Sequence, residues 1–347
     1  MNTDEHNELP EETPPIPTPP PPSPADWQSN RLDLSVVTDT VDRIRAELQK
    51  VIIGQHETVD LLLAGLFTSG HVLIEGVPGI AKTLTAKLLA QTMEAGFSRI
   101  QFTPDLMPTD VVGTTVFNLK TSEFSFSQGP IFSNIILIDE INRSPAKTQA
   151  ALFEVMEEYQ VTMDGTTYPM DFPFFVVATQ NPIEQEGTYK LPEAQLDRFL
   201  FKINMEYPNL EEEKAILYRF RKDFRITQSD QVAKVCEVET IRQCRDLIEQ
   251  VLIKDELLDY IANIIYDTRN NGDLFLGASP RASLAIMKAS KAMAAMNGRD
   301  FVTPDDIQAV AYPALNHRVI LTPEREMEGY TSREVINDII QKIEVPR

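Results

Sequence analysis

Short apolar runs and stretches with helical periodicity alternate along the chain between about residue 36 and Pro208. Four of the runs have the length of strands and are continuously apolar, which is typical of strands buried on both faces. Strands that alternate with helices predict a parallel α/β sheet. The predicted strands cover 71–75, 135–138, 174–178 and 199–203, and the predicted helices cover 41–50, 83–94 and 144–158.

Beyond Pro208 the pattern is that of helices alone. Thr303-Pro304 is a helix start signal, because threonine is a good N-cap residue and proline fits the first helical position. We therefore predict an α/β core over 31–207, followed by a smaller all-helical domain over 208–347. The helices predicted in this second domain cover 210–224, 238–251, 256–269, 282–296 and 303–312.

Residues 1–30 have a different composition from the rest of the chain. They hold nine of the 24 prolines and six acidic residues, with few apolar side chains. Such a segment buries too little apolar surface to offset the entropy lost on ordering, so we predict a disordered tail with local polyproline II character. A spacer and a docking site for a proline-recognising partner are both open roles.

The charge balance bears on possible partners. Fifty-two acidic residues against 32 basic ones give a net charge of −20, which counts against binding of a nucleic-acid backbone. Cys236 and Cys244 have a spacing that fits no zinc or redox motif, and two reduced thiols suit a cytoplasmic protein. The sequence shows no secretory signal and no run of 18 apolar residues, so we expect no membrane span.

A glycine-rich segment lies between the strand at 71–75 and the helix at 83–94. In this context backbone amides and a helix N-terminus bind phosphate, Lys82 reaches the β- and γ-phosphate oxygens, and the Thr83 hydroxyl binds Mg²⁺. Ala81 replaces a glycine of the generic pattern, which is tolerable if its backbone keeps a negative φ. A turn without function is the alternative. The predicted phosphate loop is Gly76-Val77-Pro78-Gly79-Ile80-Ala81-Lys82-Thr83.

Two carboxylates end the strand at 135–138. We expect Asp139 to hold Mg²⁺ through water and Glu140 to polarise the attacking water. Both the phosphate loop and this pair follow strands, so they fall at the same edge of one parallel sheet, where ligands bind.

Three further polar residues are candidates for contact with the γ-phosphate. Asn181 ends the next strand and is a candidate sensor, although it could instead cap the turn at Pro182. Arg198 lies beyond that strand and could act across a subunit boundary as an arginine finger. Arg281 sits in the first turn of a helix, where the helix dipole disfavours a cation, and is a candidate second sensor. Surface ion pairing or plain solvation is the alternative for each arginine.

Taken in order, these stretches resemble the MoxR family of AAA+ ATPases, from about Ile52 to Ile320. The resemblance extends beyond the generic nucleotide motifs. Lys190, where the family more often has proline, departs from the pattern without an evident consequence. The stretches that carry the resemblance are Phe102–Asp110, Gly129–Phe132, Asp139–Arg143, Thr148–Leu152 and Thr179–Phe199, the last including Glu186-Gly187-Thr188-Tyr189.

The resemblance implies a homo-oligomeric ring, usually a hexamer, with ATP and Mg²⁺ at each interface and with Gly54 and Gln55 among the nucleotide contacts. It also implies an insert near 113–128 and a hairpin near 160–173, elements that face the pore or the client in this clade. The family resembles chaperones that mature proteins or insert metal cofactors. Their partners typically carry a von Willebrand factor A domain.

We therefore predict an ATP-hydrolysing, chaperone-like motor. A magnesium-chelatase-like ATPase subunit is the nearest alternative. A nucleic-acid motor is disfavoured by the net charge and by the absence of a basic aromatic cluster. A scaffold that binds ATP without turnover is disfavoured because Glu140, Asn181 and Arg198 are all present. The sequence does not distinguish whether Arg281 acts in its own subunit or across the interface.

Overall fold

The computed structural model describes residues 31–120, 122–182, 188–221 and 231–346. The proline-rich tail at 1–30 and the Glu186-Gly187 pair of the longest motif lie outside these residues. Asp33–Arg347 form one compact unit. The division at residue 208 therefore remains a prediction, based on the change from strands to helices.

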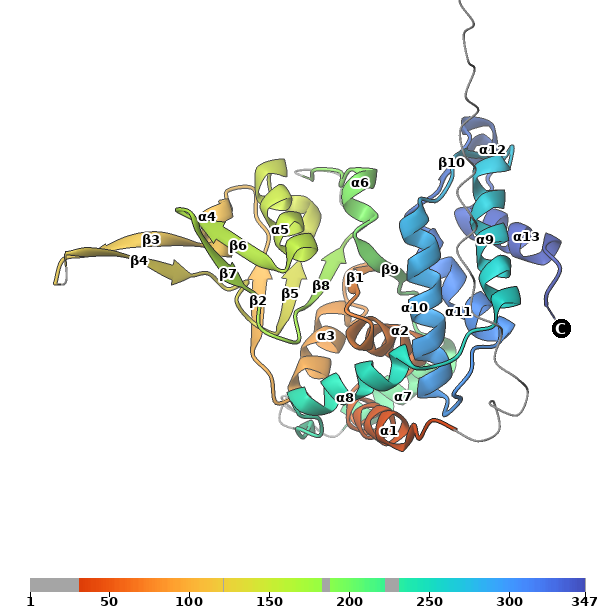
Figure 1. The fold of residues 1–347 in the computed structure, drawn as a ribbon, viewed down its shortest axis with the longest axis horizontal. Coiled ribbons are helices and arrows are strands. Elements are labelled where there is room, and N and C mark those ends of the chain that lie inside the picture. The colour runs from red at the N-terminus through yellow and green to blue at the C-terminus, as the bar shows by residue number, and fades with distance from the viewer. Residues whose placement is uncertain (1–30, 121, 183–187, 222–230, 347) are drawn as a thin grey trace, which may run out of the picture. The chain divides into compact units, whose positions relative to one another are not determined.

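A five-stranded parallel sheet is the centre of this unit, with strand order β2-β5-β8-β1-β9 (Figure 1). The four predicted strands are all present. The fifth, β2, escaped prediction because only one of its five residues, Ile100, is buried, so it has no continuous apolar run. The strands are β1 (His71–Glu75), β2 (Phe97–Gln101), β5 (Ile135–Asp139), β8 (Phe175–Gln180) and β9 (Phe199–Asn204).

The sheet is stabilised by apolar side chains that are buried on both of its faces. All five residues of β5 are buried, as are the first five of β8. Each such aliphatic side chain contributes roughly 1.5–3 kcal/mol by leaving water. On one side, the apolar face of α5 (Ala146–Glu158) joins these strands in a single cluster. Its members include Leu73, Ile136, Ile138, Leu152, Phe153, Val176, Ala178 and Phe199.

Helices flank the sheet and continue beyond it. The later helices α8 and α10 pack against α1 and α2, which is why contacts do not separate the two predicted domains (Figure 1). The other α-helices outside the site are α1 (Ser35–Gln49), α2 (His56–Phe67), α6 (Glu193–Leu196), α8 (Val238–Glu249), α9 (Asp255–Asn270), α10 (Pro280–Met296), α11 (Pro304–Leu315), α12 (Pro323–Met327) and α13 (Ser332–Lys342).

The prediction of an all-helical C-terminal part is wrong, because this part also contains a short pair of strands. Leu274–Leu276 (β10) pairs antiparallel with Ile320–Leu321 (β11). These strands are too short for a periodicity to show in the sequence. Among the described helices, none is both long and apolar enough to cross a bilayer.

Two antiparallel hairpins extend from the sheet. β3 (Gly113–Asn118) and β4 (Glu123–Gln128) occupy the range expected for an insert, between the short helix α4 (Pro108–Val112) and β5. β6 (Gln160–Met163) and β7 (Thr166–Pro169) precede β8. In Figure 1 the β3–β4 hairpin projects away from the five-stranded sheet.

His71, at the start of β1, makes the stability of the fold depend on pH. Its ring is buried, Nδ1 accepts a hydrogen bond from the Val176 amide at 3.1 Å, and Nε2 lies 3.2 Å from the Met156 carbonyl oxygen, to which it donates. Only the neutral ring satisfies both contacts. Burial lowers the pKa of His71 from 6.5 to about 4.

We therefore expect acid to destabilise the protein through this residue. Protonation favours the unfolded chain, so the stabilising contribution is complete above pH 6.5 and is lost as pH falls towards 4, by about 3 kcal/mol in total. Denaturant unfolding at pH 7.5 and pH 5 should show a smaller loss in His71→Gln than in the unchanged protein. Equal losses in both proteins would remove His71 as the cause.

Candidate functional site

The loop between β1 and α3 (Lys82–Gln91) turns the chain sharply at the carboxyl end of the sheet. Gly79 has φ +89° and Ala81 has φ +68°. The expectation of a negative φ at Ala81 is wrong: a left-handed residue is what turns the chain directly into the helix, at a cost of roughly 1 kcal/mol for its methyl group. No side chain caps α3, so its first amides are available to an anion.

A cavity of about 800 Å³ opens in front of this loop. That volume lies in the range of small-molecule sites. Most of the predicted nucleotide contacts line it, whereas Gly54, Gly76 and Val77 do not. The predicted residues that line it are Gln55, Pro78, Gly79, Ile80, Ala81, Lys82, Thr83, Asp139, Glu140 and Asn181.

Lys82 lies across the base of the loop. Its ammonium group donates hydrogen bonds to the Gly76 carbonyl and, at 3.0 Å, to the Gln180 carbonyl at the end of β8. These acceptors hold a positive charge between the ends of two neighbouring strands. A phosphate bound by the loop amides would lie beside this charge.

The two predicted magnesium ligands lie next to each other. Thr83 Oγ1 donates to Asp139 Oδ1 at 2.8 Å, and Thr179 Oγ1 donates to the same oxygen at 3.2 Å. Asp139 is buried at the end of β5. A hydroxyl and a carboxylate are the hard oxygen donors that Mg²⁺ takes together with nucleotide phosphates and water, so this pair fits the ion.

Arg99 is a site residue that the sequence analysis missed. Its Nε lies 2.6 Å from Asp139 Oδ2, and it extends from the edge strand β2 into the cavity. The signal in the sequence was the alternation of Arg99 and Gln101 in one short strand. That alternation places both side chains on the same face of β2.

Glu140 is held in a fixed orientation directly after β5. Its backbone has φ +57°, and its amide donates to Thr179 Oγ1 at 3.1 Å. Gln101 Nε2 donates to Glu140 Oε2 at 2.8 Å, and Arg143 Nε forms an ion pair with the same oxygen at 3.2 Å. The carboxylate therefore has one oxygen engaged by two neighbours while its residue faces the cavity.

Asn181 follows β8, is buried, and lines the same cavity as Glu140. The wall is apolar at another part of the cavity. There, residues before α2 meet α7 (Leu210–Phe220), and a flat aromatic base would find apolar contacts. The apolar lining includes Val51, Ile52, Ile53, Tyr207, Pro208, Ile216 and Phe220.

Gly54 packs against the Glu212 side chain of α7, the helix that lines this apolar part of the cavity. A Cβ at Gly54 would lie 2.1 Å from Glu212 Oε1, and the residue has φ +69°. Glu212 caps the start of α7 by accepting from the Asn209 amide at 2.9 Å. A side chain at Gly54 would therefore push the Glu212 carboxylate out of this cap, and the left-handed backbone would strain it as well.

Arg198 and Arg281 lie elsewhere and do not line this cavity. Both guanidinium groups pair with Glu157 near the end of α5: Arg198 Nη2 is 2.7 Å from Glu157 Oε2, and Arg281 Nη2 contacts Oε1. The structure thus brings the two predicted γ-phosphate arginines together, at a distance from their own phosphate loop.

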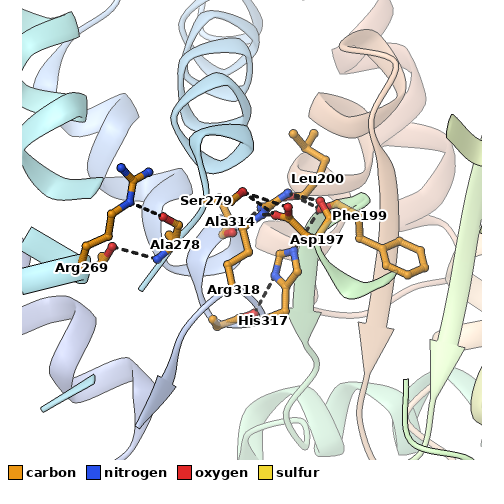
Figure 2. A network of polar contacts seen from close by, with 11 residues as sticks. Asp197, Phe199, Leu200, Arg269, Ala278, Ser279, Ala314, His317 and Arg318 are labelled. Atoms are coloured by element: carbon orange, nitrogen blue, oxygen red, sulfur yellow. Dashed lines mark hydrogen bonds and ion pairs between the residues drawn. The ribbon is translucent and has the colours of Figure 1, made fainter. Parts of the chain in front are cut away.

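A network of polar contacts holds the backbone next to each of these arginines (Figure 2). Arg318, with 3% of its side chain exposed, donates to Asp197 Oδ1 at 2.7 Å and to the carbonyls of Phe199 and Leu200. Ser279 Oγ donates to Asp197 Oδ2 at 2.9 Å. Asp197 precedes Arg198 in the chain and Ser279 is the N-cap of the helix that carries Arg281, so one carboxylate positions both.

The sequence and the fold match known proteins. Residues 71–201 match the "ATPase family associated with various cellular activities (AAA)", and residues 266–339 match the AAA lid domain. Together with the parallel sheet, these matches define the class as a AAA+ P-loop protein with a lid.

Similar proteins identify the family within this class. The chain is 42% identical over 323 residues to Chaperone MoxR1 of Mycobacterium tuberculosis, covering 90% of this chain and 84% of that protein. It is 46% identical over 299 residues to the uncharacterized protein YeaC of Bacillus subtilis, covering 86% and 92%. A crystal structure of a candidate ATPase from Cytophaga hutchinsonii superposes with a TM-score of 0.83 at 44% identity, covering 90% and 97%. The chain belongs to the MoxR family of AAA+ ATPases.

Proposed function

We propose that the chain hydrolyses ATP at the interfaces of a homo-oligomeric ring, a hexamer as the family resemblance implies, and uses the cycle to remodel a protein client. One observation carries the proposal. Lys82, Thr83, Asp139, Glu140 and Asn181 surround one cavity, whereas Arg198 and Arg281 lie outside it. A second subunit is therefore needed to complete the site.

Binding of ATP depends on the loop and its surroundings. The amides of residues 78–83 and the Lys82 ammonium group bind the phosphates, and the apolar wall before α7 takes the adenine. Thr83 and Asp139 would hold Mg²⁺, which neutralises charge on the β- and γ-phosphates. Arg99 must leave Asp139 Oδ2 for that oxygen to accept a ligand, and its half-exposed side chain is free to turn towards the phosphates.

Glu140 is the residue that polarises the attacking water. Gln101 and Arg143 hold one of its carboxylate oxygens, which fixes the direction in which the other oxygen accepts a proton. Asn181 lies in the same wall and would orient the water or the γ-phosphate.

Charge that develops on the γ-phosphate is stabilised from the neighbouring subunit. Among the described residues, Arg99 is the one arginine that lines the cavity, and it pairs with Asp139. Arg198 and Arg281 of the adjacent subunit would supply the missing cations. An arginine in this role is worth roughly 10³–10⁵ in rate.

The client is proposed to be a protein. The β3–β4 hairpin exposes Leu119 and Phe124, with 86% and 73% of their surfaces accessible, and such apolar side chains suit contact with another polypeptide. A relative is named a chaperone. The net charge of −20 fits a partner with a von Willebrand factor A domain, whose metal site often accepts an acidic ligand from its partner.

Trapping tests the client role. Glu140→Gln should hold the ATP state and retain a client protein during purification with ATP, whereas Lys82→Ala should retain none, because ATP fixes the shape of the ring. Single- and double-stranded DNA should leave ATPase activity unchanged at physiological salt. Removal of residues 1–30 should also spare hydrolysis. Stimulation by DNA of several-fold, with no protein trapped, would favour a nucleic-acid motor instead.

A further inference from the structure

One carboxylate holds both of the arginines that the proposed function assigns to the neighbouring active site. Glu157 uses Oε2 for Arg198 and Oε1 for Arg281, so neither oxygen is left for another strong donor. The arginines come from distant parts of the chain, since Arg198 precedes β9 and Arg281 lies in the first turn of α10. Glu157 therefore joins the core to the C-terminal helices at the surface that would face a neighbour.

Each of the three side-chain nitrogens of Arg198 is either engaged or buried in this arrangement. Its Nη2 is engaged by Glu157, its Nη1 donates to the Phe153 carbonyl, and its Nε is buried without a hydrogen-bond partner in the described chain. Only 28% of the side chain is exposed, against 51% for Arg281. Arginine binds phosphate best through two parallel N–H groups, and Arg198 can offer these only after it leaves α5.

We infer that Glu157 is a latch: in a free subunit it keeps Arg198 and Arg281 on α5, and the phosphates of a neighbour's ATP displace it when the ring closes. The inference rests on the proposed function, because it needs a nucleotide that is shared between subunits. ATP carries more negative charge than a carboxylate and competes for both arginines at once. ADP, which lacks the γ-phosphate, competes less well, so the latch would re-form after hydrolysis.

A latch opposes assembly, and its removal should favour assembly. Glu157→Gln keeps the shape of the side chain and removes its charge, which weakens the hold on both arginines. We expect the protein concentration that gives half-maximal ATPase activity, at saturating ATP and Mg²⁺, to fall about three- to tenfold, since partly exposed ion pairs have modest strength.

Glu154→Gln is the matched control. Glu154 lies one turn earlier on the same helix, is exposed, and forms no ion pair within the described residues. The Glu154→Gln substitution removes the same charge from the same helix but releases neither arginine. It should therefore leave the protein concentration for half-maximal ATPase activity unchanged. Thermal unfolding of both variants should first show that the fold is intact.

A second arm separates the latch from a general charge effect. In an Arg198→Ala/Arg281→Ala background, Glu157 has neither arginine to pair with. Adding Glu157→Gln should therefore not change ring assembly, measured by sedimentation velocity with ATP. A shift in that background, a shift in Glu154→Gln, or an unchanged or higher half-maximal concentration in Glu157→Gln would each overturn the latch. If the unchanged protein neither assembles with ATP nor hydrolyses it at any concentration, the proposed function falls together with the latch.

Discussion

Replacing Glu140 by glutamine is expected to lower ATP turnover by about 10²- to 10⁴-fold while nucleotide affinity stays close to that of the unchanged protein. The amide has the shape of the acid and still accepts a hydrogen bond from Gln101, so the site keeps its geometry. What it loses is the ability to take a proton from water. Single-turnover hydrolysis and titration with a fluorescent ATP analogue measure the two effects separately.

Lys82→Ala is the contrasting variant. It removes the ammonium group that lies at the base of the loop, so we expect ATP to bind about tenfold to a hundredfold more weakly. If both variants lose nucleotide binding to the same extent, the separate roles assigned to Glu140 and Lys82 are wrong.

Two inactive variants should restore activity when they are mixed. Arg198→Ala keeps a complete cavity and Lys82→Ala keeps a complete pair of arginines, because these groups lie apart in each chain. In an equal mixture with random order, about a quarter of the interfaces join a sound cavity to a sound arginine pair. ATPase activity across mixing ratios should therefore peak near the equal mixture.

A second mixture decides where Arg281 acts. Arg198→Ala mixed with Arg281→Ala should stay inactive if both arginines serve the neighbour, because no subunit then offers an intact pair. If Arg281 serves its own nucleotide, that mixture regains activity. No recovery with Lys82→Ala, in rings shown to contain both subunits, would leave Arg198 with a role inside its own subunit.

The central strands could be predicted from the sequence because they are buried on both faces. Burial on both faces makes β5 and β8 continuously apolar, and that pattern needs no knowledge of their neighbours. The edge strand β2 buries only Ile100, so it has no continuous apolar run and gives a weak signal. The β10–β11 pair has the same difficulty, since two or three residues show no period.

The residues of the candidate site also fall into those that could be predicted from the sequence and those that could not. That Lys82, Thr83, Asp139 and Glu140 line one cavity could be predicted, because a local motif and a preceding strand fix the position of each. The partners that hold them could not be predicted, since Arg99 and Gln101 come from β2 and reach the site only through strand pairing. Glu157 carried no sequence signal, because its role depends on two residues that are distant in the chain.

The Asp197 network connects the C-terminal helices to Arg198, and in the proposed ring this connection would set the order of events. Arg318 belongs to the segment after α11, yet it is bonded to the residues on both sides of Arg198. In the proposed ring, a movement of the C-terminal helices would therefore also move Arg198, which the proposal places in the next subunit's site. We expect that a subunit that has just released phosphate no longer holds Arg198 in its neighbour's site, so that ATP hydrolysis proceeds around the ring in sequence.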